Sequence, residues 1–336
     1  MANITDVAKL AGVSPGTVSK YLNNADGLRE PNRLAIEAAI EKLQYTPNLL
    51  ARNLRINSSS TIAVVAQEIT NPFHALLYNT VRKCAQKNNY SVVLYSVDDI
   101  KGNIAGMFGQ IPVKYFSGIL LCYLIDMPQA YSFALANQSV PTVVISNDLH
   151  LSEAHPDICS VYIDIKKGIM DVVDHLVGLD MRKIAFLSSA TDQPEFEPKM
   201  AGFLQALNQH GLEPANIVYP NHEFSAMAGY ELASQLLECD EMPDAVIVGS
   251  DIMAMGVMRC LADHGIQVPR DLLLASCDNI MLSSVYCPAL TTVNLPIEEA
   301  SSKACQLLLD QISKKPLPGG VTQFSTQLVV RETTNR

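Results

Sequence analysis

No apolar stretch in the 336-residue sequence approaches the roughly 18 residues that a membrane-spanning helix requires. The first residues, Met1–Asp6, also lack the basic segment and following apolar segment of a secretory signal peptide. We therefore expect a cytoplasmic protein without membrane contact. Hydrophobic residues make up 48% of the chain and charged residues 17%, a composition typical of globular proteins with large cores. The length favours two or three domains.

Metal-binding and enzymatic motifs are scarce as well. None of the eight cysteines forms a Cys-x-x-Cys pair, and most lie in apolar stretches such as the one around Cys122. This pattern favours buried, reduced thiols over disulfides or metal ligands. The seven histidines are scattered, and the sequence has no Walker-type phosphate loop and no His-Glu-x-x-His zinc motif. We expect a protein that is not an enzyme and that holds neither a metal nor a cofactor.

Negative charge dominates the chain, with a net charge of −10, but it is distributed unevenly. Residues 1–60 contain seven Lys/Arg and five Asp/Glu, which gives a net charge of +2. The remaining residues contain 17 Lys/Arg and 29 Asp/Glu, which gives −12. A mildly basic segment ahead of an acidic body is typical of a protein that contacts DNA only through that segment.

Three short helices and no strand are expected in the first 45 residues. The first covers Thr5–Ala11, with Thr5 as a plausible N-cap and Gly12 at its end. The second starts with Ser14 as N-cap and Pro15 at the first helical position, where the missing N–H of proline is not needed. The third covers about 32–43, and its expected apolar face consists of Leu34, Ala35, Ala38, Ala39 and Ile40.

The first two helices have the pattern of a helix-turn-helix. The side chains expected to face inward are Val7, Ala8 and Ala11 from the first helix, and Val13, Val18 and Leu22 from the second. In this motif the second helix enters the major groove, and its early residues meet the base edges. An ordinary hairpin of two helices without DNA binding is the alternative that the pattern alone leaves open.

A short helix and a polar linker are expected next. Thr46 and Pro47 form a cap and a helix start, and Asn57–Ser60 is a flexible polar run. Because a short isolated helix is marginal in water, we expect this one to order only on DNA. The predicted domains are a helix-turn-helix domain at 1–46, a hinge helix and linker at 47–60, and a core at 61–336.

From residue 61 onward, short β-rich runs alternate with amphipathic helical segments, which indicates parallel sheets joined by crossover helices. The candidate strands are 61–66, 91–96, 118–123, 142–146, 160–164, 183–189, 217–219, 245–250, 272–277 and 291–294. We expect an α/β core of two doubly wound parallel-sheet subdomains, roughly 61–160 plus 292–330, and 161–291. Ligands of such folds lie at the carboxyl ends of strands, so a site between the subdomains is expected.

Several motifs are shared with a known family over essentially the whole chain. They are Asp6–Ala8, Ala11–Ser14, Thr17–Ser19 and Asn23 in the head, and Tyr45–Asn48 and Ala51–Leu54 in the hinge. In the core they are Asn71–Phe73, Gly249–Asp251, Val268–Pro269, Cys277–Asn279, Pro288–Val293 and Leu328–Arg331. With these motifs the sequence closely resembles the lactose-repressor/galactose-repressor (LacI/GalR) family. The resemblance implies a small all-α helix-turn-helix head joined to a periplasmic-binding-protein-like core.

The resemblance implies that the base-reading positions fall on Pro15, Gly16 and Lys20. Neither Pro15 nor Gly16 carries a side-chain donor or acceptor, a departure from the family's pattern. Lys20 is therefore the one clear candidate for contacting guanine. Contacts that position the DNA backbone are expected from Thr5, Ser14, Thr17, Ser19, Asn23 and Tyr45. For Tyr45, packing against the third helix is an equally good interpretation.

In the hinge, Leu54 matches the leucine that family members insert into a central minor-groove step. An apolar wedge of this kind unstacks bases and bends the duplex. Arg52 and Arg55 flank Leu54 and are expected to meet phosphates. The alternative is that the leucines of this segment pack on the core.

The ligand positions implied by the resemblance are Phe73, Ser146, Asn147, Lys199, Phe224, Asp251 and Asp278. Asp251 is the expected anchor for ligand hydroxyls, with capping of its own helix as the alternative. Three positions depart from the family's pattern, because Lys199 replaces an arginine, Ser146 an aspartate and His74 a second phenylalanine. Exchange of arginine for lysine replaces a bidentate fork by a single ammonium.

The function that the resemblance implies is sequence-specific, DNA-binding transcriptional regulation, most simply repression controlled by a small-molecule effector. A sugar or sugar phosphate is the leading candidate for the effector, followed by a nucleoside or purine. The expected assembly is a homodimer on pseudo-palindromic, double-stranded operator DNA, since two-fold protein symmetry matches two-fold DNA symmetry. A corepressor-dependent regulator or an activator remains open. A solute-binding protein fits less well, because it needs a signal peptide and has no helix-turn-helix.

Overall fold

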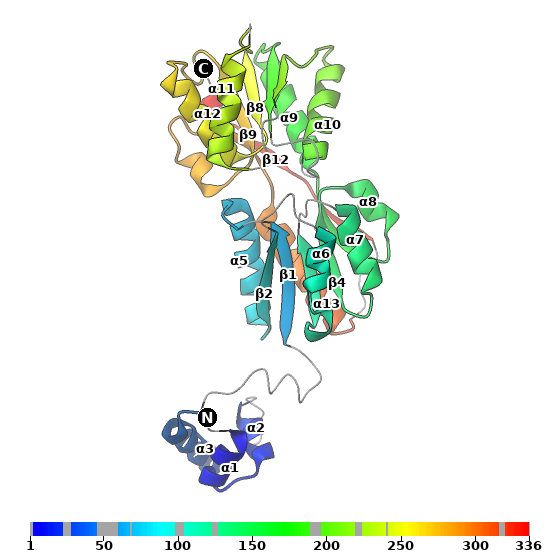
Figure 1. The fold of residues 1–336 in the computed structure, drawn as a ribbon, viewed down its shortest axis with the longest axis vertical. Coiled ribbons are helices and arrows are strands. Elements are labelled where there is room, and N and C mark those ends of the chain that lie inside the picture. The colour runs from blue at the N-terminus through cyan, green and yellow to red at the C-terminus, as the bar shows by residue number, and fades with distance from the viewer. Residues whose placement is uncertain are drawn as a thin grey trace. The chain divides into compact units, whose positions relative to one another are not determined.

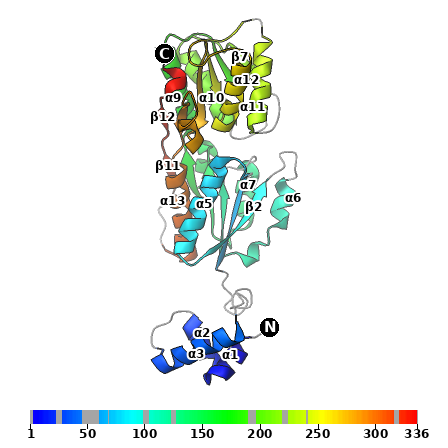
Figure 2. The same cartoon turned by 90° about the vertical axis from the view of Figure 1, so that its left-hand side faces the viewer.

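The computed structural model describes residues 3–22, 28–45, 60–67, 69–97, 104–122, 127–188, 196–218, 224–239, 241–315 and 320–335. The chain divides into two compact units, Met1–Ser59 and Ser60–Arg336. Each unit is described by itself, the first as the head and the second as the core (Figures 1 and 2). None of the described helices is both long and apolar enough to cross a membrane.

The described part of the head contains three helices, α1 (Ile4–Ala11), α2 (Pro15–Leu22) and α3 (Glu30–Leu43) (Figure 1). The prediction that Thr5 caps α1 is wrong. Asn3 is the N-cap, because its side chain accepts from the backbone N–H groups of Thr5 and Asp6 while Asp6 accepts from the Asn3 N–H in return. Gly12 ends the helix with φ +67°, a conformation that glycine adopts without strain.

The helices of the head share one small apolar core. Its fully buried members are Val7, Ala8, Val18, Ile36 and Ala39. The expected face of α3 is partly wrong, because Leu34 is 58% exposed and Ile36, two residues further along, is buried instead. The buried side chains of α3 are Ile36 and Ala39, which pack with Val7, Ala8 and Val18 of the other two helices, so the packing of the three helices and not the alanine-rich pattern determines the buried face.

The core contains two six-stranded sheets, as the alternation of strands and helices predicted. The first sheet has the order β11-β5-β4-β3-β1-β2, and all of its pairs are parallel. Its strands are β1 (Thr61–Gln67), β2 (Ser91–Val97), β3 (Gly118–Cys122), β4 (Thr142–Ser146), β5 (Cys159–Ile163) and β11 (Val321–Phe324). The second sheet has the order β12-β10-β9-β8-β6-β7, with only β10 and β12 antiparallel. Its strands are β6 (Ile184–Leu187), β7 (Asn216–Val218), β8 (Ala245–Val248), β9 (Leu273–Asp278), β10 (Thr291–Asn294) and β12 (Gln327–Val329).

Helices cover both faces of each sheet, which explains why the strands are apolar without alternation. Along β1, Ile62 and Val64 face the side that holds α5 and α13, whereas Ala63 and Val65 face α6 and α7. The helices around the first sheet are α5 (Pro72–Lys87), α6 (Ile104–Gln110), α7 (Met127–Ala136), α8 (Leu149–Ala154) and α13 (Ile297–Ile312). Those around the second are α9 (Ile165–Gly178), α10 (Phe196–Gln209), α11 (Ala226–Leu237) and α12 (Asp251–Asp263).

One predicted boundary between the two subdomains is wrong. Residues 292–330 were assigned to the first subdomain. This holds for α13, which packs on the first sheet, and for β11, which pairs with β5, but β10 pairs with β9 and β12 pairs with β10 in the second sheet. The strands β11 and β12 were not expected at all. Both are short and lie at sheet edges, where half-buried residues give little apolar signal. The chain therefore passes between the two sheets three times, after β5, after β10 and between β11 and β12.

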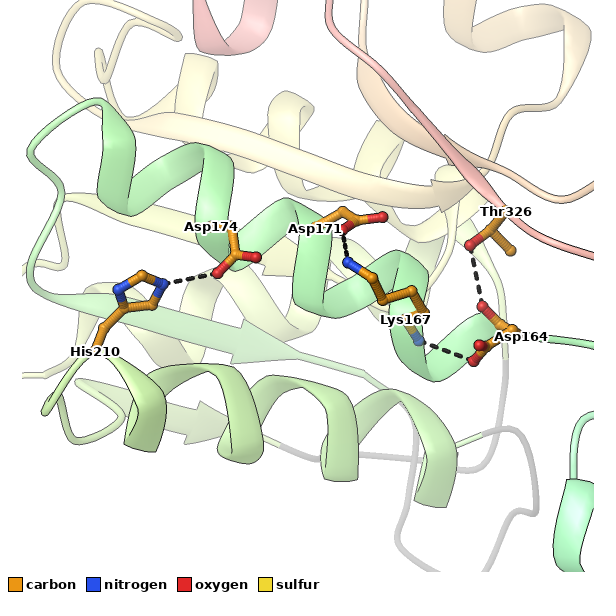
Figure 3. A network of polar contacts seen from close by, with 6 residues as sticks. All are labelled: Asp164, Lys167, Asp171, Asp174, His210 and Thr326. Carbon is orange, nitrogen blue, oxygen red and sulfur yellow. Dashed lines mark hydrogen bonds and ion pairs between the residues drawn. The ribbon is translucent and has the colours of Figure 1, made fainter.

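Two of these crossings are joined to each other (Figure 3). The Asp164 side chain caps α9 by accepting from the Lys167 N–H at 3.0 Å, and the Asp164 carbonyl accepts from Thr326 Oγ1 at 3.0 Å. Gly168 allows this close approach, since a Cβ there would lie 2.5 Å from Val293 Cγ1 and 2.8 Å from Thr326 Oγ1. Further along α9, Lys167 pairs with Asp171, and Asp174 joins α9 to His210.

The cysteines are free thiols, but they are less uniformly buried than expected. Cys122, Cys260, Cys277 and Cys305 are buried, whereas Cys287 is exposed. Cys287 follows the half-buried Tyr286 in the loop before β10, so the apolar sequence around it does not correspond to a strand or helix of the core.

Candidate functional site

The second helix of the head presents the residues expected to read DNA. Pro15, Gly16 and Lys20 are all exposed on α2, and Gly16 and Lys20 are one helical turn apart. A Cβ at Gly16 would touch nothing closer than Ser14 Oγ at 3.6 Å, so the fold of the head does not require a glycine there. The surface of α2 is therefore free of bulky side chains at its start and carries one cation a turn later.

Ser14 begins α2 as expected. Its Oγ accepts from the Thr17 N–H at 3.1 Å and lies 2.8 Å from Thr17 Oγ1. Residues 12–16 also have the Gly-x-Ser-x-Gly spacing of a hydrolase nucleophile. The motif lies here between two helices rather than after a strand, and the serine is a helix cap, which is not the geometry of a catalytic elbow.

The remaining DNA-contact candidates differ in their surroundings. Thr5 is exposed and Ser19 is half-buried. Tyr45 is half-buried and packs against the apolar core of the head, which supports a packing role. Asn23, Arg52, Leu54 and Arg55, together with the expected hinge helix, lie outside the described residues.

A polar pocket lies between the two halves of the core. It is lined by Asn71, Phe73, His74, Ile165, Lys199, Phe224, Ser250, Asp278 and Leu295. These residues come from the starts of α5, α9, α10, α11 and α12 and from the ends of β9 and β10. They therefore gather at the carboxyl ends of parallel strands, where α/β folds bind ligands. Four of the seven expected ligand residues are among them, namely Phe73, Lys199, Phe224 and Asp278.

Lys199 is the buried cation of this pocket. It is 4% exposed, and its Nζ donates to the Gly249 carbonyl at 2.7 Å. The ammonium also lies 5.8 Å from the centroid of the Phe224 ring, within the range of a cation–π contact. Burial, with a smaller contribution from the Lys199 charge, lowers the pKa of neighbouring His74 to about 4. The His74 ring is therefore neutral at pH 7.

Asp278, which supplies the carboxylate of the pocket, lies in a strained stretch of backbone. Asp278 has φ +120° and Asn279 has φ +54°, and neither is a glycine. The turn is held by the Asn279 side chain, which donates to Asn294 Oδ1 at 2.9 Å and accepts from Arg331 at 2.7 Å. Backbone strain that surrounding contacts maintain is typical of functional sites.

Asp251 does not line the pocket. It is completely buried, and its Oδ1 accepts from Ser276 Oγ and from Thr292 Oγ1, the latter at 2.6 Å. Its Oδ2 accepts from the Ile280 N–H at 2.8 Å. The alternative that Asp251 caps its own helix is wrong, because the cap of α12 is Ser250, whose Oγ accepts from the Met253 N–H. Asp251 instead ties α12 to β9, to β10 and to the turn that follows Asp278.

Ser146 and Asn147 lie at the end of β4 and are also buried away from the pocket lining. The Ser146 hydroxyl accepts from the Asp148 N–H at 3.0 Å and donates to the Asp148 carbonyl at 3.1 Å. Sequence reasoning did not include Asn71, His74 and Ser250 among the site residues. Asn71 and Ser250 could have been found as helix caps that directly follow strands or their turns, and His74 as the neighbour of Phe73.

These features define a class of protein, in which a helix-turn-helix head is joined to a two-part α/β core that holds a pocket between its halves. Residues 3–48 match the model of bacterial regulatory proteins of the lacI family, and residues 173–334 match a periplasmic binding protein-like domain. The HTH-type transcriptional repressor PurR of Pectobacterium atrosepticum is 30% identical over 334 residues, covering 98% of this chain and 96% of that protein. Catabolite control protein A of Priestia megaterium is 29% identical over 332 residues, covering 98% of both chains. This chain belongs to the LacI family.

Solved structures agree with this assignment. The lac repressor dimer bound to operator and the anti-inducer ONPF has a TM-score of 0.87 at 26% identity, covering 99% of both chains. The protein is therefore a DNA-binding transcriptional repressor of the effector-controlled kind and not an enzyme, as the sequence predicted. The head and the periplasmic-binding-protein-like core are likewise confirmed.

Proposed function

We propose that this cytoplasmic repressor binds a pseudo-palindromic operator as a homodimer and that a small effector in the core pocket changes its affinity for DNA. The observation that carries the proposal is the pocket itself, which polar and aromatic side chains from both halves of the core line together. Support also comes from the similar lac repressor, whose structure was solved as a dimer with operator and anti-inducer.

A second copy of the chain is the proposed occupant of an apolar groove on the outer side of the second sheet. The groove runs between α11 and α12 and the loop before β10, and its lining includes Met227, Tyr230, Met258 and Tyr286. Met227 is 68% exposed. Val285, which directly precedes Tyr286 in the chain, is 69% exposed. Apolar side chains gathered at a groove favour a protein partner, and a dimer of this chain satisfies that need.

Phe73, Lys199, Phe224 and Asp278 are the proposed effector contacts. The two aromatic rings can cover the faces of a small ring, while the ammonium and the carboxylate can bind its polar substituents. A sugar or sugar phosphate fits this combination best, and a nucleoside or purine is second. We assign Asp251 the role of positioning the Asp278 turn rather than that of binding the effector.

The proposed switch is a change in the angle between the two halves of the core at the three crossings. The contact between Asp164 and Thr326 and the close packing at Gly168 hold two of these crossings together. An effector can shift such an equilibrium only through its different affinity for the two arrangements. A ligand that contacts Phe73 on one half and Lys199 on the other has that property.

The proposal is tested by gel-shift and footprinting measurements on the promoter DNA next to this protein's own gene, with and without sugars, sugar phosphates, nucleosides and purines. We expect a two-fold symmetric footprint, and an operator affinity that changes with at least one class of compound. A single asymmetric half-site occupied by a monomer, or an affinity that no compound of these classes changes, would contradict the proposal.

Lys20→Ala is expected to relax the operator's base preference at one position in each half-site. With Pro15 and Gly16 unable to form side-chain hydrogen bonds, Lys20 provides an unusually large share of direct readout. We expect a loss of about 1–3 kcal/mol on the best operator and almost none on variants changed at that base pair. Lys42→Ala, which removes an exposed cation from α3, is the control. A uniform loss on all operator variants, with a lower salt dependence, would mean that Lys20 contacts only phosphate.

Leu54→Ala is expected to weaken operator binding far more than non-specific DNA binding. The substitution removes the proposed minor-groove wedge and leaves the phosphate contacts in place, so the operator loses on the order of 1–3 kcal/mol. Fluorescence anisotropy on operator and random DNA measures both affinities. Leu34→Ala, at an exposed leucine of α3, is the control. Equal losses on the two DNAs would assign Leu54 to packing.

A further inference from the structure

Two cysteines meet where α5 and α13 pack against each other on one face of the first sheet. Cys84 lies on α5 and Cys305 on α13. Cys305 Sγ is 3.8 Å from the carbonyl oxygen of Val81, on the turn of α5 that precedes Cys84. Helical side chains lean toward the preceding turn, so the Cys84 thiol also lies over Val81. The two thiols form a hydrogen bond there.

The two thiols differ in access and in acidity. Cys84 is half-buried, whereas Cys305 is fully buried, so a small solute reaches Cys84 first. The hydrogen bond from Cys305 lowers the pKa of Cys84 to about 7 against the effect of burial, and the Lys87 charge acts in the same direction. The same hydrogen bond and burial raise the pKa of Cys305. Because the thiolate is the reactive form, Cys84 is the nucleophile of the pair.

We propose that Cys84 and Cys305 form a redox-sensitive dithiol, which peroxide converts reversibly to a disulfide that joins α5 to α13. The Cys84 thiolate attacks one oxygen of hydrogen peroxide, the O–O bond breaks, and the leaving hydroxide takes up a proton to become water. The Cys305 sulfur then attacks the sulfur of the Cys84 sulfenic acid, and the S–O bond breaks. The second hydroxide leaves as water with the Cys305 proton. Two thiols are thereby oxidised to one disulfide, and hydrogen peroxide is reduced to two waters.

Other thiols of the same apolar cluster lack this combination. Cys159 on β5 is half-buried like Cys84, but burial raises its pKa by more than the Lys303 charge lowers it. Cys122 on β3 is buried, and its pKa is raised by burial alone. Both are therefore expected to react with peroxide more slowly than Cys84. Cys159 is the reference thiol for Cys84, since the two have similar exposure.

The disulfide closes a loop that includes most of the core, from α5 to α13. A cross-link of this kind stabilises a protein mainly by restricting its unfolded state. In a reducing compartment a disulfide is transient, so the bond lasts only while an oxidant is present. The pair would thus make the stability of the core respond to peroxide, independently of any effector.

Peptide mapping tests the proposal on the full-length protein. Reduced protein is treated with hydrogen peroxide at neutral pH, alkylated under denaturing conditions, and digested without reduction. We expect the Cys84 and Cys305 peptides to be joined, with a mass about 2 Da below the sum of the two, and to separate in dithiothreitol. Cys159 should remain alkylated. Absence of the joined peptides, or oxidation of Cys84 no faster than that of Cys159, would overturn the proposal without the use of any variant.

Two variants test the separate roles of the thiols. In Cys305→Ser, peroxide should leave Cys84 as a sulfenic acid that dimedone captures. In Cys84→Ser, Cys305 should remain alkylated after the same treatment. Cys159→Ser is the matched control and should form the disulfide as the wild type does. Oxidation of Cys305 in Cys84→Ser to the same extent as in the wild type would contradict the assigned roles.

Thermal unfolding measures whether the bond fits the native fold. We expect peroxide to raise the Tm of the wild type and of Cys159→Ser by roughly 4–8 °C, and dithiothreitol to reverse the rise. Cys305→Ser should show no rise, because it cannot close the loop. An unchanged or lower Tm of the joined protein would mean that the helices must distort to form the bond, which would overturn a site built by the native packing.

Discussion

Asp251→Ala is expected to destabilise the core by about 3–5 kcal/mol, because it leaves a set of buried donors without their acceptor. The Ser276 hydroxyl, the Thr292 hydroxyl and the Ile280 N–H all donate to the Asp251 carboxylate in a region without solvent access. These donors come from β9, β10 and the turn after Asp278. Loss of their hydrogen bonds to Asp251 therefore also releases the strained turn. Effector response should therefore fall even in the fraction that remains folded.

Chemical denaturation followed by circular dichroism measures the loss. Asp263→Ala is the control, because Asp263 lies at the other end of α12, where it forms a surface ion pair with Arg259 and accepts an exposed hydrogen bond from the Tyr230 hydroxyl at 3.3 Å. An exposed pair of this kind contributes less than about 1 kcal/mol. If Asp251→Ala kept wild-type stability and lost only its response to effector, Asp251 would be an effector contact and not a structural residue.

The protonation of Asp251 leads to a further prediction, on the pH dependence of stability. Burial raises the pKa of this carboxyl to about 6 in the folded protein, although its hydrogen bonds act in the opposite direction. The folded state therefore binds more protons than the unfolded state between pH 4 and pH 6, and this group's contribution to stability falls as the pH rises through that range. The stability of the wild type relative to Asp251→Asn should decrease over the same interval and be constant above it.

Gly256→Ala is expected to cost about 3 kcal/mol or more, because the backbones of α11 and α12 touch at this position. A Cβ at Gly256 would lie 1.7 Å from the Ala226 carbonyl oxygen, and one at Gly229 would lie 2.0 Å from that of Met253. Neither atom belongs to a flexible side chain, so the two helices must separate and lose contacts throughout the apolar cluster between them and the second sheet. The proposed dimer groove is lined by the same helices and should lose affinity for its partner as well.

Gly178→Ala is the matched control for Gly256→Ala. Gly178 is the last residue of α9, and a Cβ there would meet nothing within 4 Å. Alanine at such a helical position stabilises by roughly 0.5–1 kcal/mol. Thermal and chemical unfolding of the two variants should thus shift in opposite directions. A Gly256→Ala protein as stable as the wild type would show that the helices separate without a significant cost.

Local chemistry made much of the architecture predictable. Pro15 after a capping Ser14 defined the start of α2, and runs of β-branched residues defined β4 and β10 to the residue. These signals depend on neighbours in the chain, namely on a cap, on proline geometry and on the β-branched residues of a strand. The same is true of the pocket's general position, because strand ends in a parallel sheet always gather at one edge.

The sequence by itself therefore determined the helix-turn-helix, the α/β core, the family and four of the pocket residues. Tertiary structure alone decided which sheet β10 and β12 join and that Asp251 satisfies three internal donors instead of lining the pocket. It also decided that the Nδ1 of His74 has no hydrogen-bond partner among the described residues. Each of these depends on atoms that are distant in sequence, such as Thr292 and Ile280 around Asp251. Residue type and spacing do not specify such contacts, because a buried carboxylate or imidazole is equally compatible with a ligand and with an internal hydrogen bond until its neighbours in space are known.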